Sequence, residues 1–211
     1  MSENRSPLYW LRDPSLSAHA TGVIPAWLWS ADASRILWAN PVAATIFNAA
    51  SPAAIAGHTI DPKGSAALQI ARLAASLPHG SAPRLELLRG FGGRFGRALM
   101  CSCTRVILGD GTPAILILAT EAVGTQLALP EQAKRLLDGV LEAAGLFTSN
   151  GKLIHATTAA QTIIGSANML GTIGASVFAG EALASGHATG ETSVGSLTFD
   201  KIGQDLSLIH I

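Results

Sequence analysis

The sequence has few charged residues, and it lacks both a basic run and a long apolar run. Charged side chains make up 13% of its 211 residues, and 14 basic ones balance 14 acidic ones. A neutral chain of this kind is poorly suited to bind nucleic acid or an anionic membrane surface, so neither is an expected partner. The longest apolar stretches, such as 113–119, fall far short of the roughly 20 residues that a membrane-spanning helix needs.

The chain also has only two cysteines and no recognisable signal peptide. Residues 1–7 include an acid and a proline where a signal peptide would have its apolar segment. Cys101 and Cys103 lie two apart in a predicted strand, a spacing that disulfide geometry rarely tolerates, and a secreted framework would carry more cysteines. We therefore expect a cytoplasmic protein. Its apolar content of 48% is ample for a folded core.

The last six residues differ in character from the rest of the chain. Residues 206–211 look like the in-frame translation of a transposon-end sequencing adaptor, and the segment before them stops without a terminal helix or polar tail. We therefore expect a foreign tail, and a natural protein that continues beyond Asp205. On this view His210 has no part in a functional site.

Most of the first half alternates between strand and helix signals. An aromatic strand over 26–30 and a second strand over 35–39 flank a polar turn, and Asn40 followed by Pro41 is a strong helix start. An amphipathic helix is predicted over 65–77. Three further strands complete the pattern, at 84–89, 96–108 and 112–121. Strands followed by helices and then by strands predict an α+β fold, with one antiparallel sheet and its helices on one face.

A predicted helix over 129–143 then leads into a second copy of the pattern. A strand, turn and strand over 144–156 precede a helix that begins at Thr157 or Thr158, and a last strand is predicted over 191–202. When the two copies are aligned on their turns, Asn40 falls on Thr157, which indicates an internal repeat of about 120 residues. The predicted helix could pack on its own domain or on a second chain, and we expect a homodimer. Its apolar stripe consists of Leu129, Ala133, Leu136, Leu137 and Val140.

The ordered combination in the first copy resembles a PAS domain. The resemblance rests on Trp27-Leu-Trp29, the Asp-containing turn, Arg35-Ile-Leu-Trp-Ala-Asn40, the helix start Pro41-Val-Ala-Ala44 and the closing hairpin turn Gly109-Asp-Gly-Thr112. It implies a PAS-like antiparallel sheet, followed by a linker helix and a second, incomplete PAS-like unit. The expected parts are a leader (1–22), PAS-like domain 1 (23–122), the linker helix (123–143), a partial PAS-like domain 2 (144–205) and the adaptor-derived tail (206–211).

PAS domains hold haem, flavin, small acids or nothing, and the residues here support neither haem nor flavin. Cys101 and Cys103 lack the polar helical setting of a flavin-adduct cysteine, and His58 at a helix end is better explained by the helix dipole than by haem ligation. The glycine-rich stretch 90–96 lies between strands and is expected to be a flexible connection. No metal site and no nucleophile–base–acid set is visible, so the chain itself is expected to be non-catalytic.

The aromatic and aliphatic positions of the first copy are the candidates for a ligand pocket or a packed core. Trp27 and Trp29 should face one way and Leu28 the other, because side chains alternate along a strand. The candidate positions are Trp29, Trp38, Phe47, Ile70 and Leu73.

Two PAS-like units in tandem resemble the N-terminal region of alphaproteobacterial sensor histidine kinases. The resemblance implies a sensory and regulatory region of a cytoplasmic two-component kinase, which controls autophosphorylation through packing that a ligand or partner changes. ATP and the response regulator would bind only the missing downstream part of the parent protein. Two alternatives remain: the input region of a diguanylate cyclase, and a PAS dimerisation module with no enzymatic output.

Overall fold

The structure is a computed structural model that describes residues 6–56, 60–78, 80, 82–91, 98–203 and 206–210. It divides into two compact units. Residues 22–127 form one unit, and residues 1–21 together with 128–211 form the other. The expected leader therefore belongs to the same unit as the second PAS-like copy. Among the described residues, none of the helices combines the length and apolar character needed to cross a membrane.

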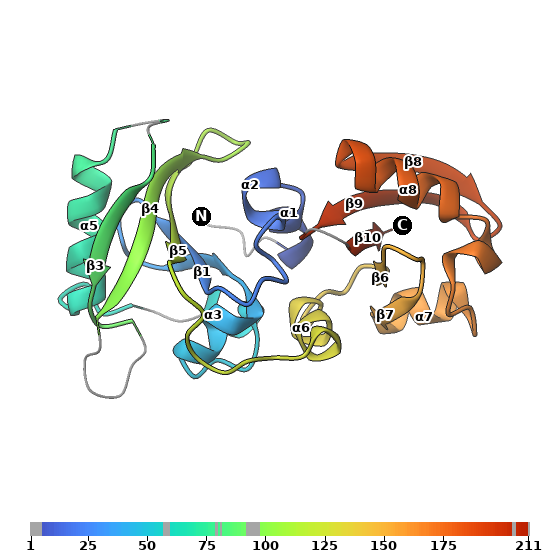
Figure 1. Ribbon diagram of the computed structural model, residues 1–211, viewed down its shortest axis with the longest axis horizontal. Helices are drawn as coiled ribbons and strands as arrows, with labels where there is room; N and C mark the ends of the chain where they lie inside the picture. The colour runs from blue at the N-terminus through green and yellow to red at the C-terminus, as the bar shows by residue number, and fades with distance from the viewer. Residues whose placement is uncertain are drawn as a thin grey trace. The chain divides into compact units, whose positions relative to one another are not determined.

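The first unit is a five-stranded antiparallel sheet whose inner face is covered by helices (Figure 1). Its strands run in the order β2-β1-β5-β4-β3, so the N-terminal hairpin lies beside the last strand of the unit. The predicted α+β class is confirmed. The strands are β1 (Ala26–Ser30), β2 (Ile36–Ala39), β3 (Arg84–Leu88), β4 (Leu99–Ile107) and β5 (Pro113–Ala119), and the helices are α3 (Pro41–Ile46), α4 (Pro52–Ala56) and α5 (Ser65–Ser76).

The second unit repeats this sheet, with five antiparallel strands in the equivalent order β7-β6-β10-β9-β8. The predicted single strand over 191–202 is in fact a hairpin, and residues 206–210 supply the fifth strand, so this sheet is not incomplete. Its strands are β6 (Ala144–Thr148), β7 (Leu153–Ala156), β8 (His187–Thr192), β9 (Gly195–Ile202) and β10 (Leu206–His210). Its helical elements are α7 (Thr158–Ile164), the 3-10 turn η1 (Leu170–Ile173) and α8 (Ser176–Ser185).

The expected foreign tail is the central strand of this second sheet. β10 pairs with β6 on one side and with β9 on the other, and all five of its residues are buried. Ile209 belongs to the apolar core between sheet and helices, because alternate residues of a strand face opposite sides. The structure does not test the origin of the segment, which stays a prediction. It does show that a chain ending at residue 205 would lack the middle of this sheet.

The internal repeat extends to individual hydrogen bonds at the start of each unit. The Asn40 side-chain oxygen accepts from Ala43 N at 2.8 Å and from Ala26 N at 3.3 Å, and its amide donates to Ile24 O at 2.8 Å.

In the second unit, one threonine hydroxyl makes the equivalent three contacts. Thr157 Oγ1 accepts from Ala160 N at 3.3 Å and from Ala144 N at 3.0 Å, and it donates to Glu142 O at 2.9 Å. In both units a single polar side chain caps the helix and ties it to the chain that enters the first strand. The predicted equivalence of Asn40 and Thr157 is confirmed.

Three short helices outside the repeated pattern complete the second unit. The two in the leader are α1 (Pro7–Leu11) and α2 (Pro14–Ser17), and the third is α6 (Leu129–Leu136). The Ser17 carbonyl accepts a hydrogen bond from Gly203 N at 2.8 Å, which attaches the leader to the end of β9. The helix predicted over 129–143 is shorter than expected. It ends at Leu136, and Gly139 follows in a left-handed conformation with φ +78°.

Candidate functional site

Four aromatic rings fill the space between the sheet and the helices of the first unit. Phe91 lies at their centre, with ring centroids 5.3 Å from Trp27, 5.8 Å from Trp29 and 5.9 Å from Phe47. The Phe91 contacts with Trp29 and Phe47 are edge-to-face, a geometry that stabilises by about 0.5–1.5 kcal/mol per pair beyond area burial, and the contact with Trp27 is tilted. The Trp27 indole N–H donates to Ala43 O at 3.3 Å. This part of the unit is a packed aromatic core.

The structure brings four of the five candidate pocket residues together and separates the fifth. Trp29, Ile70 and Leu73 belong to the buried core, and Phe47 packs against it. Trp38 is buried but lies outside this core. It pairs with Leu28 across β1 and β2, so it shares the opposite face of the sheet. Trp27 and Trp29 face the core together, as their spacing predicts.

Phe91 is the member of this cluster that the sequence did not reveal. It belongs to the glycine-rich stretch expected to be a flexible connection, yet it is 1% exposed. Gln69 holds the backbone just before it, because its side chain accepts from Arg89 N at 3.0 Å and donates to Arg89 O at 2.8 Å. Gly90 adopts φ +80°, and a Cβ there would lie 2.2 Å from Ser65 Oγ. The residues 92–97 that follow lie outside the described part of the chain.

Cys101 and Cys103 point into the same core as the aromatic rings. Both are free and fully buried. Burial raises the pKa of each thiol to about 12, so neither is a thiolate near neutral pH. Their role is to pack the sheet face, as predicted from their place in a strand.

The stripe expected to form a dimer or signalling helix is largely buried within the chain. Ala133, Leu136, Leu137 and Val140 are all 8% exposed or less, whereas Leu129 is 37% exposed. α6 packs beside β7. Leu137 is the C-cap of the helix and Val140 lies beyond it. A second chain could therefore use this stripe only after it had separated from its own unit, and its dimer role stays a prediction.

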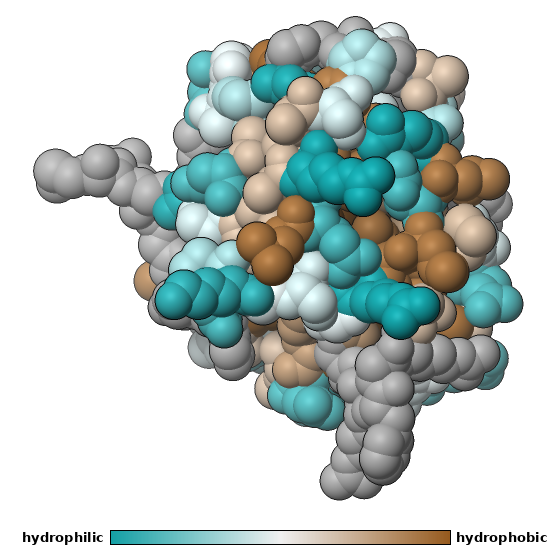
Figure 2. Space-filling view, turned by 90° about the vertical axis from the view of Figure 1, so that its left-hand side faces the viewer, coloured by the Kyte–Doolittle hydropathy of each residue, from teal (hydrophilic) through white to brown (hydrophobic). Residues whose placement is uncertain are grey.

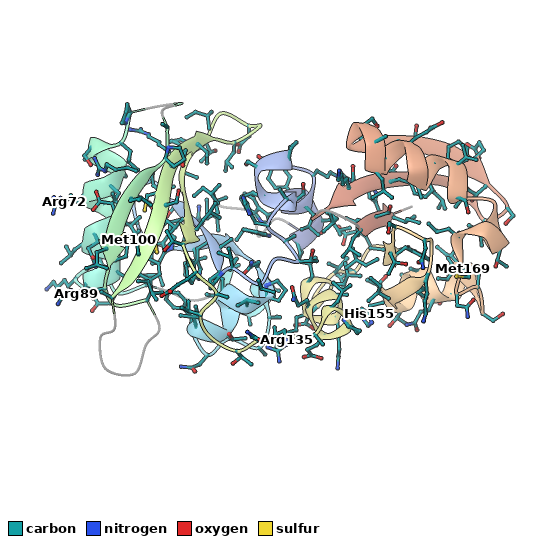
Figure 3. The ribbon with its side chains drawn as sticks, viewed as in Figure 1. Arg72, Arg89, Met100, Arg135, His155 and Met169 are labelled. Carbon is teal, nitrogen blue, oxygen red and sulfur yellow. The ribbon has the colours of Figure 1, made fainter. Side chains whose placement is uncertain are left out.

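The outer sheet face of the first unit carries exposed apolar side chains. Leu85 and Leu87 on the edge strand β3 are 65% and 51% exposed, and Met100, which pairs with Leu87, is 43% exposed. Figure 2 shows brown apolar side chains among teal polar ones on the side of this unit that faces the viewer. The sticks of Arg72 and Arg89 point away from the ribbon of the unit (Figure 3). Arg94 and Arg97, which follow in the glycine-rich stretch, lie outside the described residues.

The second unit contains a small apolar cavity between its sheet and its helices. Its volume is about 10 Å³, and Phe147, Ile164 and Leu197 are among its lining residues. A space of this size holds at most about one water molecule. The position corresponds to that of the aromatic core in the first unit, and both are filled by the protein's own side chains.

The second unit contains a hydrogen-bonded group of one carboxylate and two histidines. The Asp200 carboxylate contacts His187 Nδ1 at 2.6 Å and His210 Nε2 at 3.1 Å. Burial acts to raise the pKa of Asp200, but the hydrogen bonds and charges of the two histidines outweigh it, so the pKa is lowered and the carboxylate is ionised. These residues come together only when β8, β9 and β10 pair, and no short motif marks them.

Only some of the remaining histidines lie within the described part of the structure. His155 lies on β7 near α6 (Figure 3), where burial and then the charge of Lys134 lower its pKa. His58 and His79 lie outside the described residues. Within the described ranges, no three His, Cys, Asp or Glu side chains are grouped so that they could hold a metal ion.

Comparison with known proteins finds similarity only among solved structures. No protein-family model matches the chain, and no curated protein matches it. A domain of the sensory box sensor histidine kinase/response regulator from Geobacter sulfurreducens is 18% identical, with 54% of this chain and 96% of that chain covered and a TM-score of 0.36. An extracellular ligand binding receptor from Desulfohalobium retbaense DSM5692 is 12% identical, with 88% of this chain and 29% of that chain covered and a TM-score of 0.28.

Proposed function

We propose that this chain is the sensory and regulatory region of a cytoplasmic sensor histidine kinase of the two-component type. The observation that carries the proposal is the tandem repeat: two units with one strand order and one capping network. Such a region regulates by differential binding, because a ligand or partner that prefers one packing shifts the population towards it. Autophosphorylation, ATP binding and contact with a response regulator would belong to downstream modules.

The packed core of the first unit favours regulation by a partner rather than by a ligand held between sheet and helices. A ligand in that space would have to displace aromatic rings whose centroids are 5.3–6.5 Å apart. The exposed apolar side chains Leu85, Leu87 and Met100 offer a different route, because a second copy could bury them. The proposed homodimer contact of the first unit is therefore the β3–β4 edge of this outer sheet face, whereas Leu28 and Trp38 on the same face are already buried.

Extension of the reading frame past codon 205 in the source locus tests the kinase assignment. We expect a histidine-bearing dimerisation helix, followed by an ATP-binding domain. A Gly-Gly-Asp-Glu-Phe motif instead would assign the region to a diguanylate cyclase. A stop codon close to the present end would contradict both and leave a PAS dimerisation module.

Light scattering on the purified chain tests the proposed dimer contact. Leu87→Glu should lower the mean mass towards that of a monomer, because it places a charge in the proposed contact. Leu68→Glu is the matched control, since Leu68 is 58% exposed on α5 and lies outside that sheet face. If the chain is monomeric, or if the two variants have equal effects on mass, the proposed contact is wrong.

A further inference from the structure

The leader and the second sheet border an open pocket that has no counterpart among the predicted site residues. Its volume is about 670 Å³, within the range of roughly 300–1,000 Å³ that small-molecule sites occupy. Arg12 and Ser17 contribute from the leader, and His187, Asp200 and Lys201 contribute from β8 and β9. All of its lining residues belong to the same compact unit.

The polar groups of this pocket are predominantly basic. Arg12 and Lys201 are cationic, and His187 adds a third basic side chain, which is 60% exposed. Arg12 Nη2 also lies 3.3 Å from both ring nitrogens of His210, and His187 Nδ1 lies 2.6 Å from Asp200 Oδ1. Among the described lining residues, Asp200 is the one carboxylate, and it is 6% exposed and already paired with histidine. The nearby Asp13 carboxylate accepts from Ser15 N and Ser15 Oγ, which occupies it at the start of α2.

The pocket also has an apolar side. Leu11, Pro14 and Ala18 line it from the leader. A ligand that satisfies both sides has an anionic group near the three basic residues and a small apolar body against the leader. Inorganic phosphate would use only the first half of this surface, and a neutral alcohol only the second.

We propose that this pocket binds a small organic anion, a carboxylate or a phosphate monoester with a compact apolar group. The bound anion bridges Arg12 of the leader and Lys201 of β9, and so holds the leader against the second sheet. His210 does not line the pocket, but its ring nitrogens lie 3.3 Å from Arg12 Nη2 and its Nε2 lies 3.1 Å from Asp200 Oδ2, so the pocket depends on the strand 206–210. The proposal is independent of the output module that the chain serves.

Isothermal titration of the full chain with four probes tests the proposal. Phenyl phosphate and benzoate should bind saturably, whereas benzyl alcohol, which lacks the charge, and inorganic phosphate, which lacks the ring, should bind at least about tenfold more weakly. Hydrogen bonds to charged groups commonly contribute enough for such a difference. A preference for phenyl phosphate over benzoate, or the reverse, distinguishes the two anion classes.

Two matched charge-removing variants locate the site. Lys201→Met should weaken phenyl phosphate and benzoate about tenfold, whereas Lys152→Met removes an exposed lysine outside the pocket and should leave both affinities unchanged. Hydrogen exchange should slow at residues 14–18 when phenyl phosphate is added, because the leader is held in place.

Three results would overturn the proposal. They are the absence of saturable binding by either anion, equal losses in the two lysine variants, and benzyl alcohol binding as tightly as benzoate. His187→Gln is a second pocket variant. Circular dichroism spectra of Lys201→Met and His187→Gln that match the wild type would show that any loss of binding is not a loss of fold.

Discussion

Asn40→Ala is expected to destabilise the first unit by far more than an ordinary helix cap would. Loss of the cap itself costs about 1 kcal/mol. The change also removes the partners of Ala26 N, which is buried, and of Ile24 O, whose residue is 40% exposed. The buried amide costs roughly a further 1–2 kcal/mol, and the carbonyl costs less because water can replace the lost donor. The sum is about 3 kcal/mol, which for a domain of about 100 residues lowers Tm by roughly 12 °C or more.

The second unit supplies the control for this substitution. Because Thr157 makes the same three contacts with one hydroxyl, Asn40→Thr should retain much of the network and cost clearly less than Asn40→Ala. Thermal unfolding gives the size of each loss, and hydrogen exchange at residues 22–127 assigns it to the first unit. Equal losses for the two variants, or a loss of about 1 kcal/mol for alanine, would refute the view that one side chain joins the helix cap to the strand entry.

Three further perturbations test the core and the buried carboxylate. Gly90→Ala should destabilise the first unit by more than about 1 kcal/mol, because a Cβ clash adds to the backbone strain at φ +80°. Gly111→Ala is the control, since Gly111 has φ +83° but open space around it, and this variant should lose less stability. Equal losses of stability in thermal unfolding would contradict the role of the clash. Iodoacetamide at pH 8 should modify Cys101 and Cys103 only in denaturant, because their thiol pKa is about 12; mass spectrometry of labelled native protein would reveal the opposite. Asp200 has a lowered pKa in the folded state, so its stabilisation is present above the unfolded value of about 3.9 and is lost as the pH falls through the folded value. In an acid titration followed by circular dichroism, Asp200→Asn should lack the loss of stability that the wild-type chain shows as Asp200 is protonated. An acid-unfolding profile identical to that of the wild type would contradict the stabilising role of this carboxylate.

The elements with strong local signals are those that the sequence predicted well. The capped start at Asn40 and the apolar spacing of α5 depend on residues close together in the chain, and both lie where they were expected. The end of α6 and the β8–β9 hairpin were missed. The stripe continues past Leu136 in sequence, but the helix does not continue through Gly139. A two-residue turn at Ser193 and Val194 carries none of the usual Asn-Gly or Asp-Gly signal.

The candidate site was less predictable because its residues meet only through long-range pairing. Trp29 and Ile70 were recognised as apolar, but whether they line a pocket or fill a core depends on Phe91, which a glycine-rich stretch concealed. Arg12 and Asp200 are far apart in the chain, and no local pattern connects them. Apolar spacing therefore predicts which side chains are buried, but it does not predict whether those side chains fill a core or line a pocket.

Strand β10 is the central strand of the second sheet, although its residues resemble a foreign tail. A variant that stops after Asp205 removes pairing from β6 and β9 at once, and it exposes the apolar surface that Leu208 and Ile209 cover. A sheet split at its centre cannot retain one cooperative core, so the second unit should lose its protection against hydrogen exchange while residues 22–127 keep theirs. Unchanged protection of β6 and β9 would show that the strand is dispensable.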